Sequence, residues 1–351
     1  MNGFPRDDYR RFERYTLDRK PIAVDLSDNT NLWGAHPDAR RVLAGAADET
    51  LTRYPSLYAD DLRREVARRF QVDPACVTTG CGSDDVLDSA IRAACRPPGL
   101  VTYASPTFSM ADVLSRMNGM DTRAVPWPDA LADPGSLLES APAAVYLCTP
   151  NNPTGEPLSA RWLDGFLDKA GPDGPLVILD EAYADFHGET LVPLALDYGR
   201  ALVVRTLSKL YALAGLRVGY GLGAPAVVEE VEKSRGPYKV SALAERAAVA
   251  ALQDESGWAV EVLSEVVENR DRLIGELGRR GFEPGPSVTN FVLLPVAPHT
   301  TAGVFEQLRA RGVAVRPFPG LPGLGDCVRV TVGPWPLMDR FLAALDEVRA
   351  G

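Results

Sequence analysis

The chain has 351 residues, of which 46% are hydrophobic and 24% are charged, and these values exclude a disordered, collagen-like or coiled-coil chain. With 37 Lys and Arg against 47 Asp and Glu, the formal net charge is −10. An acidic surface repels phosphate backbones, so this charge argues against a general nucleic-acid-binding protein. The length favours roughly two domains.

The sequence favours a cytoplasmic protein without a metal centre. The first residues lack the apolar segment of a secretory signal, and no apolar run is long enough to span a membrane. The five cysteines show no Cys-x-x-Cys spacing, which is typical of reduced thiols. The three histidines are isolated from one another, which argues against a His-based metal site.

In chain order, residues 1–34 show no regular pattern and are expected to form an irregular arm. Helical spacing of apolar residues follows at 38–48 and 59–70. Short apolar runs then alternate with helical patterns, which predicts a mostly parallel sheet covered by helices. The expected strands are 76–79, 100–103, 144–148, 176–179, 202–205 and 217–222.

The C-terminal part of the chain has a different pattern. Residues 225–280 are helical without a strand signal, and residues 281–351 mix helices with short strands, as in a smaller α+β domain. The strands expected there are 290–294, 313–316 and 328–332. The segment 317–325 is rich in Pro and Gly and is predicted to be a loop.

Four segments that follow predicted strands carry residues with chemical functions, and ligands of open α/β sheets bind at this edge. In the first segment, Gly80 and Gly82 precede Ser83 at the start of a predicted helix, where free backbone N–H groups can bind an anion. An ordinary turn with Ser83 as the helix cap explains the same residues.

The second and third segments add polar groups to the same edge. Asn151 and Asn152 lie between prolines in a rigid turn. An apolar strand ends in Asp180 and Glu181, and Tyr183 follows Asp180 at a spacing that lets both face one pocket. A plain turn and an acidic helix start are the alternatives for these two segments.

The fourth segment holds a lysine beside anion-binding side chains. Thr206, Ser208 and Arg217 offer two hydroxyls and a guanidinium to a dianion. Apolar surroundings and a nearby cation would lower the pKa of Lys209 and free its amine as a nucleophile. A surface lysine with a structural arginine is the alternative. Together, the four segments match the groups that pyridoxal phosphate requires, namely a phosphate cradle, an acid for the pyridine nitrogen and an amine for the aldehyde.

The chain resembles the fold-type I, class I/II aminotransferases, and within them the histidinol-phosphate aminotransferase branch. The matching stretches occur in the order of the family, over about residues 25–345. They are Tyr54-Pro55, Gly80–Val86, Pro106–Met110, Pro150–Gly155, Asp180–Tyr183, Arg205–Lys209, Ala214–Tyr220, Ser287–Val292 and Arg329–Gly333.

The resemblance implies an α/β fold of the aspartate aminotransferase type. This fold has a large domain with a mostly parallel seven-stranded sheet between helices, and a small α+β domain. We expect the large, cofactor-binding domain over residues 35–245. Residues 1–34 and 246–351 are expected to form the small domain.

The resemblance also implies the cofactor pyridoxal 5'-phosphate and a role for each residue around its ring. Lys209 forms the Schiff base and moves the proton at the substrate's Cα, and Asp180 pairs with the pyridinium nitrogen. Asn152 and Tyr183 hydrogen-bond the 3-oxygen of the ring. Phe108 stacks on the ring, at a position where the family often has Tyr.

Further roles concern the phosphate, the substrate and the partner subunit. Tyr54 resembles the tyrosine that reaches the cofactor phosphate of a neighbouring subunit, which implies a homodimer. Arg329 matches the arginine that binds the α-carboxylate of an amino acid or 2-oxo acid substrate. The resemblance assigns the phosphate cradle to Gly82, Ser83, Asp84, Thr206, Ser208 and Arg217.

The chain departs from the family in its N-terminal arm. The family's Asn-Glu-Asn-Pro-x-Gly-like stretch reads Asn29-Thr30-Asn31-Leu32-Trp33-Gly34 here, so an acid is lost and a bulky ring appears. We expect Asn29 and Trp33 to contact the substrate. The departure weakens histidinol phosphate as the substrate and favours a specialised biosynthetic aminotransferase that acts on another amino or oxo acid.

Several alternatives stay open at this point. The first is the histidinol-phosphate aminotransferase itself, and the second is a decarboxylase or oxidase that uses the same cofactor. A non-catalytic sensor joined to a DNA-binding module is disfavoured by the acidic charge and by the length of the chain. A phosphate-binding protein without this cofactor is disfavoured by Lys209 together with Asp180 and Tyr183.

Overall fold

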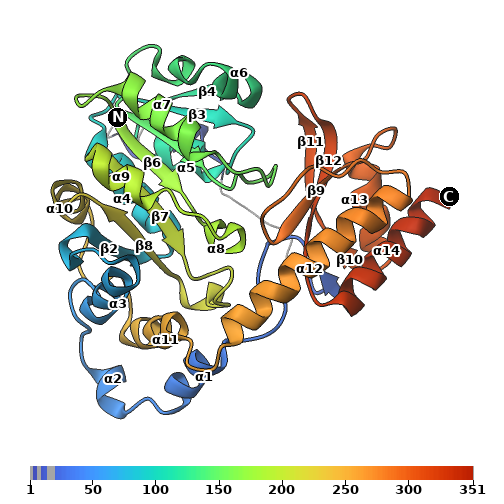
Figure 1. The fold of residues 1–351 in the computed structure, drawn as a ribbon, viewed down its shortest axis with the longest axis horizontal. Coiled ribbons are helices and arrows are strands. Elements are labelled where there is room, and N and C mark those ends of the chain that lie inside the picture. Colours follow the sequence, from blue (N-terminus) through green and yellow to red (C-terminus); the bar gives the residue numbers. More distant parts are fainter. Residues whose placement is uncertain (1–2, 6–8, 14–19, 351) are drawn as a thin grey trace.

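A seven-stranded sheet forms the centre of the computed structural model, which describes residues 3–5, 9–13 and 20–350 (Figure 1). Its strand order is β2-β8-β7-β6-β5-β3-β4, and β8 is antiparallel to both neighbours while the pairs from β7 to β4 are parallel. This confirms the predicted fold class. The strands are β2 (Val77–Cys81), β3 (Leu100–Ser105), β4 (Asp121–Pro126), β5 (Ala144–Cys148), β6 (Leu176–Asp180), β7 (Ala201–Thr206) and β8 (Val218–Gly223).

The apolar runs predict every strand of this sheet except β4. This strand lies at the edge and buries only Val125, so it has no apolar run to reveal it. Two of the predicted strands start one residue too early. Cys76 belongs to a short 3-10 turn before β2, and Arg217 adopts a left-handed conformation (φ 53°) before β8 begins.

Helices cover both faces of the sheet, and the side chains of each strand alternate between two apolar cores. One core contains Val145 and Leu147 and the other contains Tyr146 and Ile178. The first core is closed by α3 (Asp60–Phe70), α7 (Ala160–Ala170), α9 (Val192–Tyr198) and α11 (Ala242–Gln253). The second is closed by α4 (Ser83–Ala94), α5 (Met110–Met117) and α10 (Pro225–Lys233).

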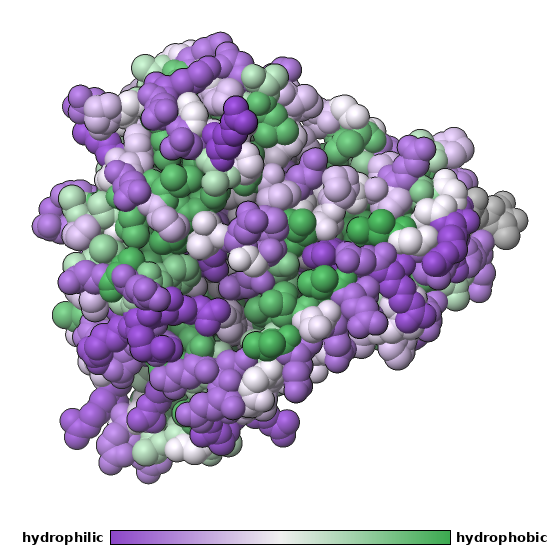
Figure 2. Space-filling view, viewed as in Figure 1, coloured by the Kyte–Doolittle hydropathy of each residue, from purple (hydrophilic) through white to green (hydrophobic). Residues whose placement is uncertain are grey.

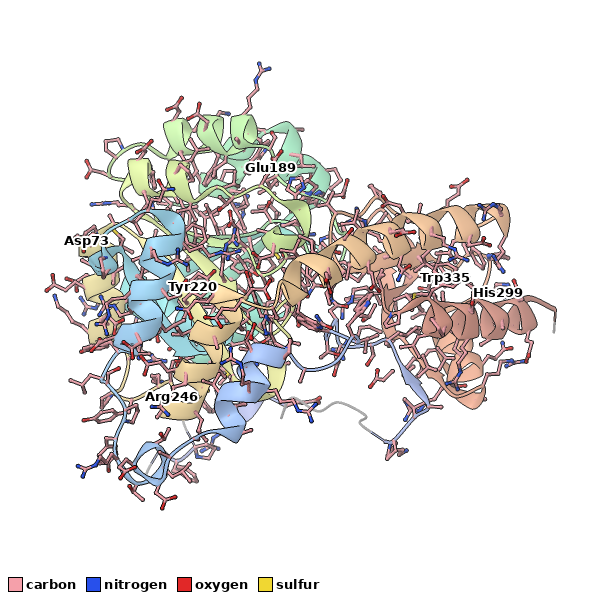
Figure 3. All side chains as sticks on the ribbon, turned by 60° about the horizontal axis from the view of Figure 1, so that its bottom comes forward. Asp73, Glu189, Tyr220, Arg246, His299 and Trp335 are labelled. Atoms are coloured by element: carbon pink, nitrogen blue, oxygen red, sulfur yellow. The ribbon has the colours of Figure 1, made fainter. Side chains whose placement is uncertain are left out.

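A second, smaller layer lies beside this sheet. The long helix α12 (Trp258–Arg279) runs towards it from the end of α11, and the labelled residues His299 and Trp335 lie there, apart from Tyr220 in the large sheet (Figures 1 and 3). The other elements are α13 (Thr301–Ala310), α14 (Trp335–Ala350), the sheet β11-β12-β9 (Arg316–Leu321, Gly325–Thr331, Phe291–Pro295) and the strand β10 (Val313–Ala314). The domain limits at residues 34 and 245 stay a prediction.

The predicted loop 317–325 is wrong for most of its length. Pro317 and Phe318 pair with Val328 and Cys327 in an antiparallel ladder, and only the tip of this hairpin turns. The prolines mislead because β11 is an edge strand, and an edge strand tolerates residues that cannot donate to a ladder.

The N-terminal segment joins the two layers. The strand β1 (Val24–Asp25) pairs with β10, and the Leu26 carbonyl accepts a hydrogen bond from the Thr331 N–H at 2.9 Å. The chain then crosses to the large sheet and enters α1 (Pro37–Ala44). Fully buried His36 lies 3.2 Å from Asp254 there, so the arm is fastened to the turn between α11 and α12.

The remaining surface elements are short, and the visible surface is largely hydrophilic. These elements are α2 (Asp48–Thr52), α6 (Trp127–Ala132) and α8 (Ala184–His187).

Apolar residues form separate groups on the face in Figure 2. Among the described helices, none combines the length and the apolar character that crossing a bilayer requires.

A buried ion pair joins the carboxyl ends of β6 and β7. The Arg205 guanidinium donates to Glu181 at 2.7 and 3.0 Å, and the side chains are 6% and 1% exposed. Glu181 also accepts from the Thr190 hydroxyl and the Leu191 N–H. Predicted site residues follow both Glu181 and Arg205 closely in the chain. This pair therefore holds together the two strand ends on which those residues stand.

Arg205→Met leaves the Glu181 carboxylate buried without its main cation. We expect the free energy of unfolding to fall by about 3–5 kcal/mol, measured as a lower urea midpoint. The matched control is Arg200→Met, which breaks an exposed pair with Asp173 (side chains 49% and 97% exposed) and should cost about 1 kcal/mol or less. Equal losses in the two variants would contradict the importance of the buried pair.

Candidate active site

Asp180 ends β6 with its carboxylate removed from water. It is 5% exposed, and its Oδ2 accepts a hydrogen bond from the Tyr146 phenol at 2.7 Å while its Oδ1 accepts from the Ala182 N–H at 3.0 Å. Burial raises the pKa of Asp180 to about 6, although both hydrogen bonds act in the opposite direction. A carboxylate in this state can share a proton with a basic ring nitrogen.

Tyr146 contacts Asp180 directly and is not among the site residues predicted from the sequence. The register pairs Cys148 with Asp180, so Tyr146 lies diagonally across the β5–β6 ladder and on the same face as Asp180. Its side chain is fully buried. The sequence feature that could have revealed it is a Tyr within an otherwise apolar strand, because its buried hydroxyl needs a hydrogen-bond partner.

Lys209 follows β7 and carries the site's amine. Its Nζ donates to the Asp28 carbonyl at 3.2 Å and lies 5.6 Å from the ring centre of Tyr183. Burial, with a smaller effect of Arg329, lowers the pKa of Lys209 to about 8. About a tenth of this amine is therefore neutral at pH 7, whereas an ordinary lysine with a pKa of about 10.4 is almost entirely charged.

Tyr183 lies between Asp180 and α8 and is 4% exposed. Its ring packs edge-on against Phe291 at 5.0 Å, and its oxygen accepts a hydrogen bond from the Asn29 amide at 2.9 Å. Burial raises the pKa of Tyr183 to about 12, so the phenol keeps its proton and can donate it in a hydrogen bond.

Arg329 on β12 reaches the large sheet. Its Nη1 donates to the Asn152 side-chain oxygen, and its Nη2 donates to the Ser27 carbonyl at 2.8 Å. Arg329 is 6% exposed and Asn152 is 7% exposed. Two residues 177 positions apart are thereby brought into direct contact.

An anion cradle forms where α4 begins. Gly82, in the left-handed region (φ 82°), precedes Ser83, the first residue of α4. A Cβ at Gly82 would overlap the Arg217 guanidinium, and a Cβ at Gly219 would overlap the Ser83 nitrogen. The two glycines therefore let an arginine and a helix N-terminus approach each other, which suits a phosphate group.

Hydroxyl and acidic groups complete this cradle. Ser208 Oγ accepts from Arg217 Nη1 at 3.4 Å and from the Thr206 hydroxyl at 2.9 Å. Asp84 lies 3.5 Å from the same guanidinium, and burial raises its pKa. Arg217 is half exposed, so its charge can still be offered to a ligand.

Three further predicted residues make other contacts within one chain. Phe108 is partly buried beside the core that contains Tyr146. The Trp33 indole N–H donates to Glu265 on α12 at 2.5 Å. Tyr54 is 84% exposed and stacks on Tyr238 at 4.9 Å, so among the described residues it is not brought to the Lys209 group.

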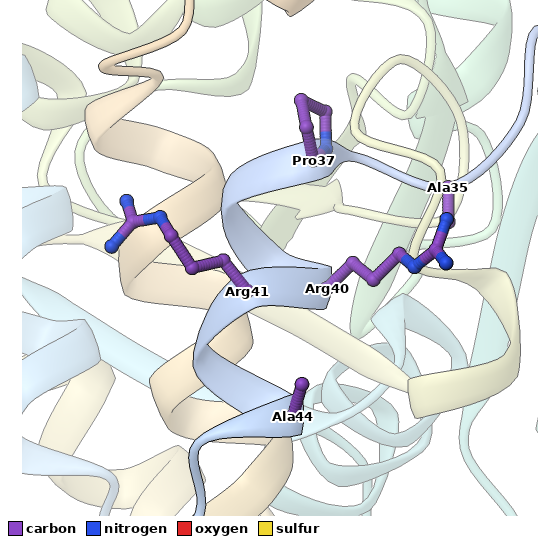
Figure 4. Close-up of a pocket in the computed structure, with 5 residues that line it drawn as sticks. All are labelled: Ala35, Pro37, Arg40, Arg41 and Ala44. Atoms are coloured by element: carbon purple, nitrogen blue, oxygen red, sulfur yellow. The ribbon is translucent and has the colours of Figure 1, made fainter.

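A shallow surface depression runs along α1 and is separate from these residues (Figure 4). Arg40 and Arg41 extend to opposite sides of the helix in this view. Its lining residues are Ala35, Pro37, Arg40, Arg41 and Ala44, and no predicted site residue is among them.

The comparison with known families decides how this site is to be interpreted. Residues 21–345 match the family described as aminotransferase class I and II. The chain belongs to this family. It is a pyridoxal-phosphate-dependent transaminase with the fold of type I, as the resemblance implied.

Individual relatives of this aminotransferase agree. It is 35% identical over 335 residues to a histidinol-phosphate aminotransferase of Halalkalibacterium halodurans, covering 93% of this chain and 89% of the relative. It is similar to the histidinol-phosphate aminotransferase of Sinorhizobium meliloti solved with pyridoxal-5'-phosphate (TM-score 0.84, 27% identity, 94% and 92% coverage). The L-threonine-O-3-phosphate decarboxylase of Porphyromonas gingivalis shares the fold (TM-score 0.82, 24% identity, 93% and 100% coverage).

The residues of this aminotransferase fit its cofactor on their own chemistry. The buried acid Asp180 suits the pyridine nitrogen, and the amine of Lys209, with its lowered pKa, suits the aldehyde. Gly82 and Gly219 let Arg217 and the start of α4 approach each other closely, which suits the phosphate.

Gly219→Ala should weaken cofactor binding, because the added methyl group would push the Ser83 nitrogen out of the cradle. We expect the dissociation constant for pyridoxal phosphate to rise by about tenfold or more, measured by titration of the stripped enzyme. Gly215→Ala is the control, since nothing lies within 4 Å of its Cβ position. Unchanged affinity in Gly219→Ala would contradict the cradle.

The rate of cofactor loading should depend on pH through Lys209. Only the neutral amine adds to an aldehyde, so the rate should rise with pH and level off above about 8, measured by stopped-flow absorbance on the stripped enzyme. Arg329→Gln removes a nearby positive charge, which should raise the pKa of Lys209 and move the profile to higher pH. Arg246→Gln, on α11, should leave it in place, and a matching shift there would refute the assignment.

Proposed function

We propose that this enzyme moves an amino group between an amino acid, or an amino alcohol phosphate, and a 2-oxo acid through a Schiff base at Lys209. The observation that carries the proposal is the amine of Lys209, which is desolvated and lies under the influence of Arg329, Arg217 and Asp84. A guanidinium suited to a carboxylate and an anion cradle both act on this one amine, which matches an amino acid joined to this cofactor.

Each residue around the ring has one task. When bound, the cofactor supplies an aldehyde for imine formation and a ring that accepts electrons from the bond broken at the substrate's Cα. Asp180 holds the proton at the ring nitrogen, which keeps the ring electron-poor. Tyr183 and Asn152 donate hydrogen bonds to the 3-oxygen, and Phe108 packs on the ring. The free amine of Lys209 would take the proton from the substrate's Cα and deliver it to the carbon that was the aldehyde carbon of the cofactor.

The phosphate and the substrate carboxylate are held at opposite ends of the site. The N–H groups of Ser83 and Asp84 at the start of α4, with Thr206, Ser208 and Arg217, hold the phosphate. Arg329 binds the α-carboxylate with both of its terminal nitrogens. Two of its hydrogen-bond partners, the Asn152 oxygen and the Ser27 carbonyl, are neutral acceptors, so a carboxylate can replace either of them at a gain in charge pairing.

The substrate side chain is the least defined part of the proposal. The names of the relatives make histidinol phosphate the second candidate. Thr30 stands where the family has an acid, and Trp33 adds a bulky ring to the arm; both features favour another amino or oxo acid over histidinol phosphate. Trp33 is tied to Glu265 on α12, so its indole is held in place near the arm residues that contact the site.

A half-reaction panel tests both the reaction and the substrate. The loaded enzyme is mixed with single amino donors, histidinol phosphate among them, and the loss of the visible imine band is followed. Transamination predicts conversion to the pyridoxamine form with release of one oxo product. Release of carbon dioxide or peroxide instead would overturn the transaminase proposal in favour of a decarboxylase or an oxidase.

Borohydride reduction tests the position of the Schiff base. The reduced cofactor should be recovered on the peptide that contains Lys209. Lys209→Ala should bind pyridoxal phosphate without a borohydride-stable bond. A label on any other lysine of the wild-type chain would refute the assignment.

We also propose a cytoplasmic homodimer in which Tyr54 reaches the phosphate of the neighbouring subunit. Support comes from a group of exposed apolar residues, Tyr54, Leu57 and Tyr238, which are 84%, 46% and 40% exposed and contact one another. Five free cysteines agree with a reducing compartment. Light scattering should give twice the chain mass, and Tyr54→Phe should weaken cofactor retention. A monomer with full retention would refute the proposal.

A further inference from the structure

Three consecutive residues of the N-terminal segment contact three different groups of the site. The Ser27 carbonyl accepts from Arg329 at 2.8 Å, and the Asp28 carbonyl accepts from the Lys209 amine at 3.2 Å. The Asn29 side chain follows, and its amide donates to the Tyr183 oxygen at 2.9 Å. Ser27 and Asp28 make their contacts through backbone carbonyls, which a substitution does not remove. The Asn29 contact comes from the side chain, so a substitution at this position can remove it.

Asn29 is held on every side. It is 1% exposed and adopts a left-handed conformation (φ 54°). Its N–H donates to the Thr331 hydroxyl at 3.0 Å, and its carbonyl accepts from the Asn290 amide at 3.1 Å. Its side-chain oxygen faces the same Thr331 hydroxyl at 3.2 Å. The Thr331 hydroxyl also donates to the Leu26 carbonyl at 2.8 Å. In this arrangement the NH₂ group of the Asn29 amide, and not its oxygen, points at Tyr183.

The direction of that hydrogen bond matters because a phenol has only one hydrogen. If the neighbour of Tyr183 were an acceptor, it would take this hydrogen. An amide NH₂ uses the oxygen instead and leaves the hydrogen free. Accepting one hydrogen bond also makes a phenol a better donor in the next.

We propose that Asn29 is a positioning residue whose amide reserves the Tyr183 phenol hydrogen for the 3-oxygen of the cofactor. The inference rests on the proposed roles of Lys209 and Tyr183. The 3-oxygen serves two donors, namely this phenol and the N–H of the protonated imine formed with Lys209. A weaker phenol contact leaves more electron density for the imine N–H, so the imine keeps its proton to higher pH.

The test is the pH titration of the visible band of the loaded enzyme. Asn29→Gly suits the left-handed backbone and removes the donor, and the midpoint should rise by about 0.5–1 pH unit. Asn29→Asp keeps the shape but presents an acceptor, so it should raise the midpoint at least as far. The charged groups that act on Lys209, which are Asp28, Asp84, Arg217 and Arg329, are unchanged in both variants. Asn29→Asp adds a carboxylate of its own, so Asn29→Gly is the variant that leaves the charge of the site unaltered.

Two further variants separate positioning from a general disturbance of the arm. In a Tyr183→Phe background, Asn29→Gly should cause no additional shift, because the phenol through which it acts is gone. Asn31→Ala is the matched control: its amide fastens the same segment to the Leu210 carbonyl at 2.8 Å, and the midpoint should stay at the wild-type value.

The outcomes distinguish this inference from the proposed function. An unchanged midpoint in Asn29→Gly, or a shift that persists without the phenol, would overturn the role of Asn29 while wild-type borohydride labelling still identifies Lys209. Failure of that labelling would overturn the proposed function itself. If Asn29→Gly does not retain the fold, by circular dichroism, the nearly isosteric Asn29→Asp replaces it in the same comparison, and only the part of its shift that disappears in the Tyr183→Phe background counts for the role of Asn29.

Discussion

The site depends on a carboxylate that has been taken out of water. Asp180 lies at the buried carboxyl end of β6, where desolvation favours its neutral form. The Tyr146 phenol and the Ala182 N–H work against this by stabilising the charge. These opposing effects leave Asp180 with a pKa of about 6. A protonated ring nitrogen beside the carboxylate would stabilise its charged form further. The cofactor therefore satisfies a group that the fold alone leaves incompletely stabilised.

The same principle applies to the cations around Asp180. Lys209 loses solvation and faces Arg329 and Arg217, so its amine becomes partly neutral, while Glu181 neutralises Arg205 beneath it. The Arg205–Glu181 pair is neutralised within the protein and supports the strand ends. Among the described residues, Asp180 and Lys209 lack such a partner and can gain one from a ligand. This division separates the structural charges from the functional ones along a single edge of the sheet.

Much of the site could be predicted from the sequence, because its residues follow strands in short, distinctive segments. Local sequence patterns indicate the chemistry of several site residues without knowledge of the fold, namely Gly82, Asp180, Lys209 and Arg217. Tyr146 could not be distinguished from an ordinary core residue, because its hydroxyl becomes functional only through the register of β5 against β6. The sequence did not predict the strands β4 and β11, because both lie at the edge of a sheet and edge strands need no apolar run.

The sequence by itself determined the family, the cofactor and the order of the chemical groups along the chain, since these depend on residue type and local spacing. Only the tertiary structure decided which groups touch. It brought Arg329 to Asn152, and it brought the arm residues Ser27, Asp28 and Asn29 to the site from the other end of the chain. Hydrogen-bond direction and desolvation arise from such contacts, so no local pattern contains them.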